Sequence, residues 1–181
     1  MAEPKGASQY GGMAKALHWG LAVLIIFMLI GGHQLEDLAP AFKSETAKLH
    51  TGVGLVILGL AIARVLWRWR HPVAPVEGLR RWEIVGSKTV HVALYGLMLM
   101  QPLVGIAMAA FATYPVEAFG VIEISALARG DNELYEGLRK LHALGFLLLS
   151  LLILVHLLAS LRHHFLKRNI VLKRMLPFTR S

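Results

Sequence analysis

The sequence predicts an all-α integral membrane protein, a single-domain bundle of four helices covering residues 1–181. Of its residues, 56% are hydrophobic and only 17% are charged, and the mean hydropathy is +0.57. The apolar residues gather in four blocks, at about 14–33, 49–68, 89–112 and 141–163. Each block approaches the roughly 20 residues that a helix needs to cross the apolar core of a bilayer.

The ends of the four blocks follow from their flanking residues. Lys15 opens the first block, where its ammonium can reach outward to the headgroups. The polar segment before it lacks the cationic start and cleavage site of a signal peptide, so we expect this helix to be retained. Pro72 and Pro75 end the second helix. Pro102 lies inside the third, where neighbouring helices can satisfy the carbonyl that it frees.

The net charge of +8 is distributed as in a membrane protein rather than a nucleic-acid-binding one. Basic residues dominate after the fourth block and between the second and third, whereas acids are concentrated in the other two connections. Cytoplasmic loops carry the excess of Lys and Arg. We therefore expect a membrane protein in contact with the lipid bilayer, with both termini in the cytoplasm; in a bacterium, this membrane would be the inner membrane. We expect no nucleic-acid partner.

Histidines at matching depths are the main functional signal. His142 and His156 lie fourteen residues apart in the fourth block, which places them on one helix face about 21 Å apart along the axis. The predicted topology brings His18 to the depth of His156, and His50 to the depth of His142. Because the chain has no cysteine, thiolate sites and covalent haem attachment are excluded. Two trans histidine pairs at two depths predict two haem groups, hence electron transfer.

The alternatives to metal ligation are ordinary roles for membrane histidines. A single histidine in a membrane helix is more often a hydrogen-bond partner of another helix than a ligand. Four histidines that agree in depth under an independently derived topology favour ligation. A di-iron carboxylate bundle is excluded because the spans lack Glu-x-x-His pairs.

Two further histidines are candidate cofactor-binding residues. His91 begins the third block at the depth of His18 and His156; it could replace either ligand, bind a haem propionate or line a quinone site. His163 follows His156 by close to two turns, so it lies near the same face and is a candidate hydrogen-bond partner for a quinone.

Cations flank the outer pair of histidines. Lys48, Arg139 and Lys140 stand directly beside His50 and His142 in the sequence. They are expected to pair with haem propionates. They could also form a positive mouth that draws small anions towards the outer haem, and the two roles are compatible. Glycines near the ligands (Gly20, Gly52, Gly54 and Gly145) could let a porphyrin approach the helix backbone.

These residues resemble the bacterial cytochrome b561 family, four-helix di-haem proteins related to the cytochrome b subunits of formate dehydrogenase and nickel–iron hydrogenase. The similarity covers nearly the full chain. The matching motifs are Leu17-His18-Trp19, Leu49-His50-Thr51-Gly52, Val90-His91 with Tyr95, Leu141-His142 with His156, and the tail around His163-His164.

The resemblance implies haem b at His18/His156 and at His50/His142, with a quinone site at His163 near the cytoplasmic haem. For the most similar stand-alone relatives it also implies oxidation of superoxide at the outer face and reduction of ubiquinone inside. The alternative is a haem b relay or anchor subunit that passes electrons between a partner redox enzyme and quinone. A haem sensor or carrier would not need two haems at opposite depths.

Overall fold

Four long helices form the described part of the protein. The structure is a computed structural model that describes residues 9–34 and 40–177. The helices are α1 (Gly12–Gln34), α2 (Pro40–Arg70), α3 (Arg81–Ala110) and α4 (Asn132–Leu161). Each contains a stretch long and apolar enough to cross a membrane. The predicted all-α membrane bundle is therefore confirmed.

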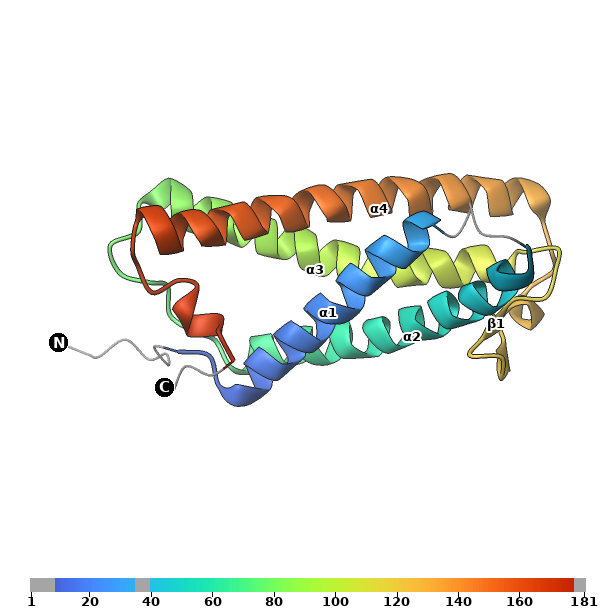
Figure 1. The fold of residues 1–181 in the computed structure, drawn as a ribbon, viewed down its shortest axis with the longest axis horizontal. Helices are drawn as coiled ribbons and strands as arrows, with labels where there is room; N and C mark the ends of the chain where they lie inside the picture. Colours follow the sequence, from blue (N-terminus) through green and yellow to red (C-terminus); the bar gives the residue numbers. More distant parts are fainter. Residues whose placement is uncertain (1–8, 35–39, 178–181) are drawn as a thin grey trace.

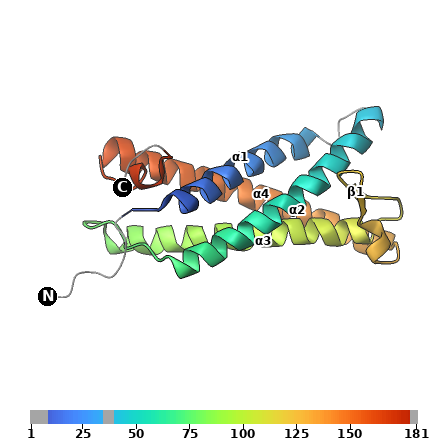
Figure 2. The same ribbon diagram turned by 90° about the horizontal axis from the view of Figure 1, so that it is seen from below.

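The bundle has two ends of different character (Figures 1 and 2). The basic end holds the starts of α1 and α3, the connection 71–80, and the segment after α4, with a π-helix (η2, Arg162–Leu166) and a short 3-10 helix (η3, Lys173–Met175). The hairpin end holds the connection between α3 and α4. Within it, β1 (Glu117–Ala118) pairs antiparallel with β2 (Ile122–Glu123), and the 3-10 helix η1 (Ser125–Leu127) follows.

Three helices begin earlier than their apolar blocks. The predicted starts at 49, 89 and 141 lie well inside helices that begin at Pro40, Arg81 and Asn132. Hydropathy locates only the part of a helix that fits in lipid, whereas the helical hydrogen bonds continue into the polar flanks. The side chain of Asp131 caps α4 by accepting a hydrogen bond from the Leu134 N–H at 3.0 Å.

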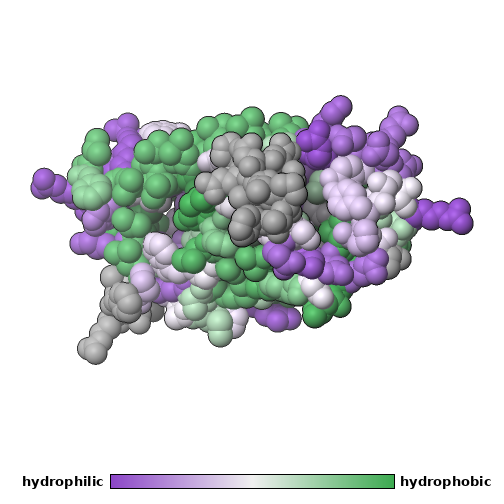
Figure 3. All heavy atoms as spheres, turned by 45° about the vertical axis from the view of Figure 1, so that its right-hand side comes forward, coloured by the Kyte–Doolittle hydropathy of each residue, from purple (hydrophilic) through white to green (hydrophobic). Residues whose placement is uncertain are grey.

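The buried core lies in the middle of the bundle, and apolar side chains also cover its outside. Leu21, Ile57, Ala61 and Leu149 belong to one buried cluster that joins α1, α2 and α4. Large apolar residues such as Leu147 (61% exposed) face outward. On the face drawn in Figure 3, hydrophobic atoms gather over the middle of the molecule and hydrophilic atoms gather towards its two ends. Such a surface is stable when lipid surrounds it.

The hairpin packs on the start of α2, close to His50. The Phe119 N–H donates to the Lys48 carbonyl at 3.1 Å, and Phe119 has a positive φ of 54°. A Cβ added to Gly52 would lie 2.5 Å from the Phe119 ring. The absence of a side chain at position 52 therefore allows the ring to lie against the α2 backbone.

Candidate functional site

Two histidine pairs lie inside the bundle, one towards each end. His18 of α1 and His156 of α4 form the basic-end pair, with ring centres 6.3 Å apart. His50 of α2 and His142 of α4 form the hairpin-end pair, with ring centres 6.2 Å apart. All four side chains are half-buried. The structure thus brings together the same pairs that depth and topology predict, and their role as ligands stays a prediction.

The spacing of both pairs fits a metal ion held between two imidazoles. An imidazole nitrogen binds a metal at about 2 Å and lies about 1.1 Å from its ring centre, so trans rings have centres about 6.2 Å apart. Two glycines make room for the hairpin-end rings. A Cβ at Gly32 would lie 3.2 Å from His50 Cε1, and one at Gly105 would lie 3.2 Å from His142 Cε1. Within the part of the chain that the structure describes, the buried Nδ1 of His142 also has no hydrogen-bond partner.

The glycines near the histidines differ in what they contact. A Cβ on Gly20 or Gly54 would meet nothing within 4 Å. A Cβ on Gly145 would lie 2.0 Å from Oε1 of Gln101, whose Nε2 donates to the His142 carbonyl at 2.7 Å. Gly145, like Gly52, therefore accommodates a protein side chain, which differs from the expected role beside a porphyrin.

His91 lies beside the basic-end pair. Its ring centre is 5.4 Å from that of His156, shorter than the trans spacing of about 6.2 Å. Its Nδ1–H donates to the Ser87 carbonyl at 2.6 Å, which leaves Nε2 as the free ring nitrogen. This geometry favours a role next to the cofactor over axial ligation opposite His156.

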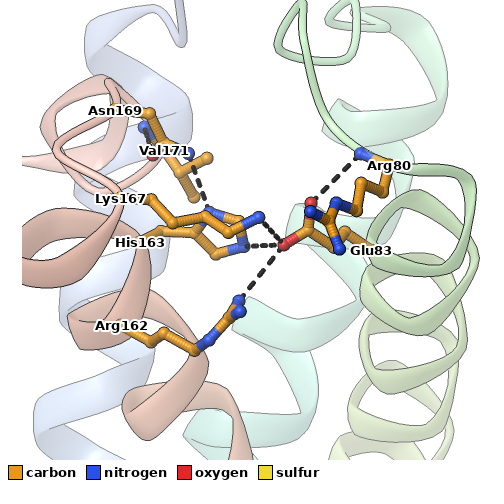
Figure 4. A network of polar contacts seen from close by, with 7 residues as sticks. All are labelled: Arg80, Glu83, Arg162, His163, Lys167, Asn169 and Val171. Atoms are coloured by element: carbon orange, nitrogen blue, oxygen red, sulfur yellow. Dashed lines mark hydrogen bonds and ion pairs between the residues drawn. The ribbon is translucent and has the colours of Figure 1, made fainter.

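A buried carboxylate at the basic end collects several positive groups (Figure 4). The Glu83 side chain, 2% exposed, accepts from Lys167 and from Arg162 at 3.2 Å. The His163 Nε2 lies 3.8 Å from the same oxygen, and the Asn169 amide donates to His163 Nδ1 at 2.8 Å. This cluster fixes the segment after α4 against the start of α3.

The π-helix after α4 presents these groups to Glu83. Its closing bond runs from the Lys167 N–H to the Arg162 carbonyl, five residues back, at 3.1 Å. A π turn adds one residue to the ordinary helical turn and often occurs at functional sites. Here it places Arg162, His163 and Lys167 around one carboxylate.

An arginine lies inside the bundle at the level of His18. The Arg64 NH1 group donates to the Ala14 carbonyl at 3.1 Å, and NH2 donates to His18 Nδ1 at 3.1 Å. The guanidinium carbon is 5.8 Å from the centre of the Tyr95 ring on α3. Arg64 thus contacts α1 and α3 from within α2.

The predicted outer cations have acidic neighbours. The Lys48 Nζ lies 3.0 Å from Glu45 and 3.5 Å from Glu117. These carboxylates compensate the charge of Lys48 near the hairpin-end pair. Its pairing with a haem propionate or an anionic substrate stays a prediction.

Arg139 and Lys140 lie at the hairpin end of α4, and both are exposed. The Arg139 Nε donates to Glu136 at 2.9 Å. Lys140 is the exposed cation nearest in sequence to His142. The positive mouth expected from the sequence is therefore partly neutralised by acids.

Three polar residues of the two sites escape the sequence analysis: Arg64, Glu83 and Gln101. Arg64 could be noticed because an ionisable residue inside an apolar span marks a site by default. Glu83 follows Arg80 at capping-box spacing, and the Arg80 N–H does donate to its carboxylate at 3.0 Å. No local pattern marks Gln101.

The comparisons agree with the fold. Residues 9–178 match the family described as prokaryotic cytochrome b561. The chain is 29% identical to the probable superoxide oxidase CybB of Yersinia pestis, covering 96% of this chain and 98% of that protein. It is 25% identical to cytochrome b561 homolog 2 of Escherichia coli K12, covering 93% and 91% of the two chains. This chain therefore belongs to the prokaryotic cytochrome b561 family, whose members carry electrons in the membrane by means of haem b.

Proposed function

We propose that this protein binds two haems b and transfers electrons from superoxide, at the hairpin end, to ubiquinone at the basic end. The observation that carries the proposal is the pair of ring spacings, 6.3 Å and 6.2 Å, found at two levels of one bundle. Two levels suit a protein that moves electrons across a membrane. A protein that only stored or sensed haem would need one.

The four histidines would hold the haems through nitrogen alone. His18 with His156 would hold one haem, and His50 with His142 would hold the other. Bound there, haem b supplies reversible one-electron chemistry at each level. The helix that carries each imidazole would keep it in place. Gln101 also fixes the backbone at His142, because its side-chain amide donates a hydrogen bond to the His142 carbonyl.

The proposed orientation places the basic end in the cytoplasm and the hairpin end in the periplasm. The basic end carries the Lys and Arg excess that cytoplasmic loops show. Superoxide would then arrive at the hairpin end, near Lys48, Arg139 and Lys140. Two superoxide ions would each lose one electron and leave as dioxygen, and one ubiquinone would take two electrons and two protons to become ubiquinol.

His163 is the proposed hydrogen-bond donor to the quinone. Since its Nδ1 accepts from Asn169, its proton is on Nε2. The distance from His163 Nε2 to the Glu83 carboxylate is 3.8 Å, which is longer than a hydrogen bond. The Nε2–H group would therefore be available to donate to a quinone carbonyl. His91, with its Nε2 free, is a second polar group for a cofactor or quinone at this end.

One observation favours the alternative of an electron relay. Glu45, Glu117 and Glu136 neutralise the cations that would attract superoxide. An electron-donating protein that carries complementary charges could dock on this surface of mixed charge. A small anion such as superoxide would be attracted to it only weakly. The relay would then receive electrons from its partner and show little activity alone.

Stopped-flow mixing with superoxide distinguishes the two functions. The oxidised holoprotein should show rapid haem reduction, then reoxidation that requires ubiquinone, and superoxide dismutase should abolish both. His50→Ala should lose the response. His71→Ala is the matched control, because His71 is exposed and stacks on Trp67 at the end of α2.

Two outcomes would contradict superoxide oxidation. Haems that stay oxidised under superoxide but accept electrons from ubiquinol would support the relay. A superoxide response that persists in His50→Ala would exclude the hairpin-end pair as the entry point.

The contribution of Lys140 can be measured in the same assay. Lys140→Gln should slow haem reduction at low salt and weaken the dependence of the rate on ionic strength. Lys88→Gln, an exposed change at the basic end, should leave the rate unchanged.

A further inference from the structure

The contact between Arg64 and His18 cannot persist when His18 binds iron. In the structure the guanidinium NH2 donates to His18 Nδ1, which must offer a lone pair. A neutral imidazole that ligates a metal has no such lone pair left, because one nitrogen bonds the metal and the other carries the proton. This holds whichever nitrogen faces the iron. Arg64 must therefore take another acceptor once the site is loaded.

A second guanidinium with unused donors lies one turn further along α2. Arg68 NH1 is buried and has no hydrogen-bond partner among the described residues. Its guanidinium carbon lies 5.3 Å from the centre of the Tyr10 ring. Arg64 and Arg68 are four residues apart, so both lie on the face of α2 that meets α1. Buried donors without partners are rare and indicate an absent acceptor.

No carboxylate of the described residues contacts either guanidinium. The acid of this end, Glu83, accepts instead from Arg162 and Lys167. Cations at membrane depth are stable when an opposite charge or a backbone carbonyl accepts their hydrogen bonds. A bound group that carries carboxylates would supply acceptors to both guanidiniums.

We propose that Arg64 and Arg68 form a carboxylate-binding site for the propionates of the haem held by His18 and His156. The proposal rests on the proposed function, since it needs iron at this pair. Haem b carries two carboxylates, which matches two guanidiniums on one helix face. With His18 bound to iron, Arg64 would donate to a propionate in place of His18 Nδ1.

The test compares haem loss in variants that hold only the basic-end haem. In a His142→Ala background, full-length protein in nanodiscs is loaded with haem b, and transfer to excess apomyoglobin is followed by absorbance. Arg64→Gln and Arg68→Gln should each lose haem about tenfold faster. Arg70→Gln, exposed at the end of α2, is the matched control and should not change the rate.

The second arm uses haem dimethyl ester, which lacks carboxylates. In the His142→Ala background, the proteins with and without Arg64→Gln should lose haem dimethyl ester at equal rates. In a His156→Ala background, which keeps only the hairpin-end haem, Arg64→Gln should have no effect.

Two results would overturn the proposal. One is an unchanged loss rate in both arginine variants with haem b. The other is a difference that persists with the dimethyl ester, which would assign the arginines to packing or to another anion such as a lipid phosphate. A parent His142→Ala protein that binds no haem would instead refute the proposed ligand pair, so the two failures are distinguishable.

Discussion

Replacing His142 by alanine should remove one haem and leave the other almost unchanged. The variant loses one of the two imidazoles of the hairpin-end pair, whose ring centres are 6.2 Å apart. The basic-end pair shares no residue with it. The haem content should therefore fall from about two per chain to about one.

The coupling between the two levels follows from the spacing of their ligands on α4. His142 and His156 are separated by about 21 Å along the helix axis. At an effective dielectric constant of about 20, two unit charges at that distance interact by about 0.8 kcal/mol. This energy corresponds to about 35 mV. The midpoint potential of the remaining haem should shift by no more than this amount.

A redox titration and a pyridine haemochrome assay measure both quantities. The wild type should show two one-electron components, and His142→Ala should show one. His156→Ala should retain the other component, and the double variant should retain neither. Imidazole added to His142→Gly should restore the missing component, because the small ligand can enter the space that the side chain leaves.

Two results would refute this reasoning. Loss of both haems in His142→Ala would mean that His18 and His156 do not hold a haem by themselves, against the proposed ligand pair. A shift above about 100 mV, or about 2.3 kcal/mol, would mean that the levels interact far more strongly than the spacing on α4 allows.

Three further predictions concern the contacts that hold the bundle together. Gly145→Ala should destabilise the holoprotein by about 1 kcal/mol, since the new Cβ displaces the Gln101 amide; adding Gln101→Ala should restore part of the loss in a thermal melt followed by haem absorbance. Trp19→Phe removes the hydrogen bond from the indole to the carbonyl of Met175, so trypsin should cut the C-terminal segment about fivefold faster. An unchanged cleavage rate would show that this hydrogen bond does not limit the detachment of the segment. Glu83→Gln should raise hydrogen exchange across 162–169 and leave the middle of α3 protected; equal exchange in both proteins would contradict its role as the anchor.

The sequence predicts the helices and the pairing of the histidines because both depend on one coordinate, depth in the membrane. Hydropathy places the spans, the charge of the connections gives their direction, and His18, His50, His142 and His156 then have definite depths. Pairing by depth needs no knowledge of how the helices rotate about their axes. The same reasoning places His91 at the right level but cannot give its ring spacing to His156.

Contacts between distant segments could not be predicted in this way. Lys48 meets Glu117 only because the hairpin folds back on α2. Glu83 meets Lys167 only because a π turn ends α4. Both contacts depend on segments of irregular backbone. Such segments have no periodic pattern of apolar and polar residues from which they could be predicted. Arg64 lies inside the predicted block 49–68 and within α2, but its contacts with Ala14 and His18 depend on how α1 packs against α2.

The packing of Phe119 against Gly52 has a consequence for sequence variation among relatives. A side chain at position 52 and a ring at position 119 cannot occupy the same space, since the added Cβ would lie 2.5 Å from the ring. A relative with alanine or a larger residue at 52 must therefore carry a smaller residue at 119 or a differently placed hairpin. The two positions should change together, although 67 residues separate them in the chain.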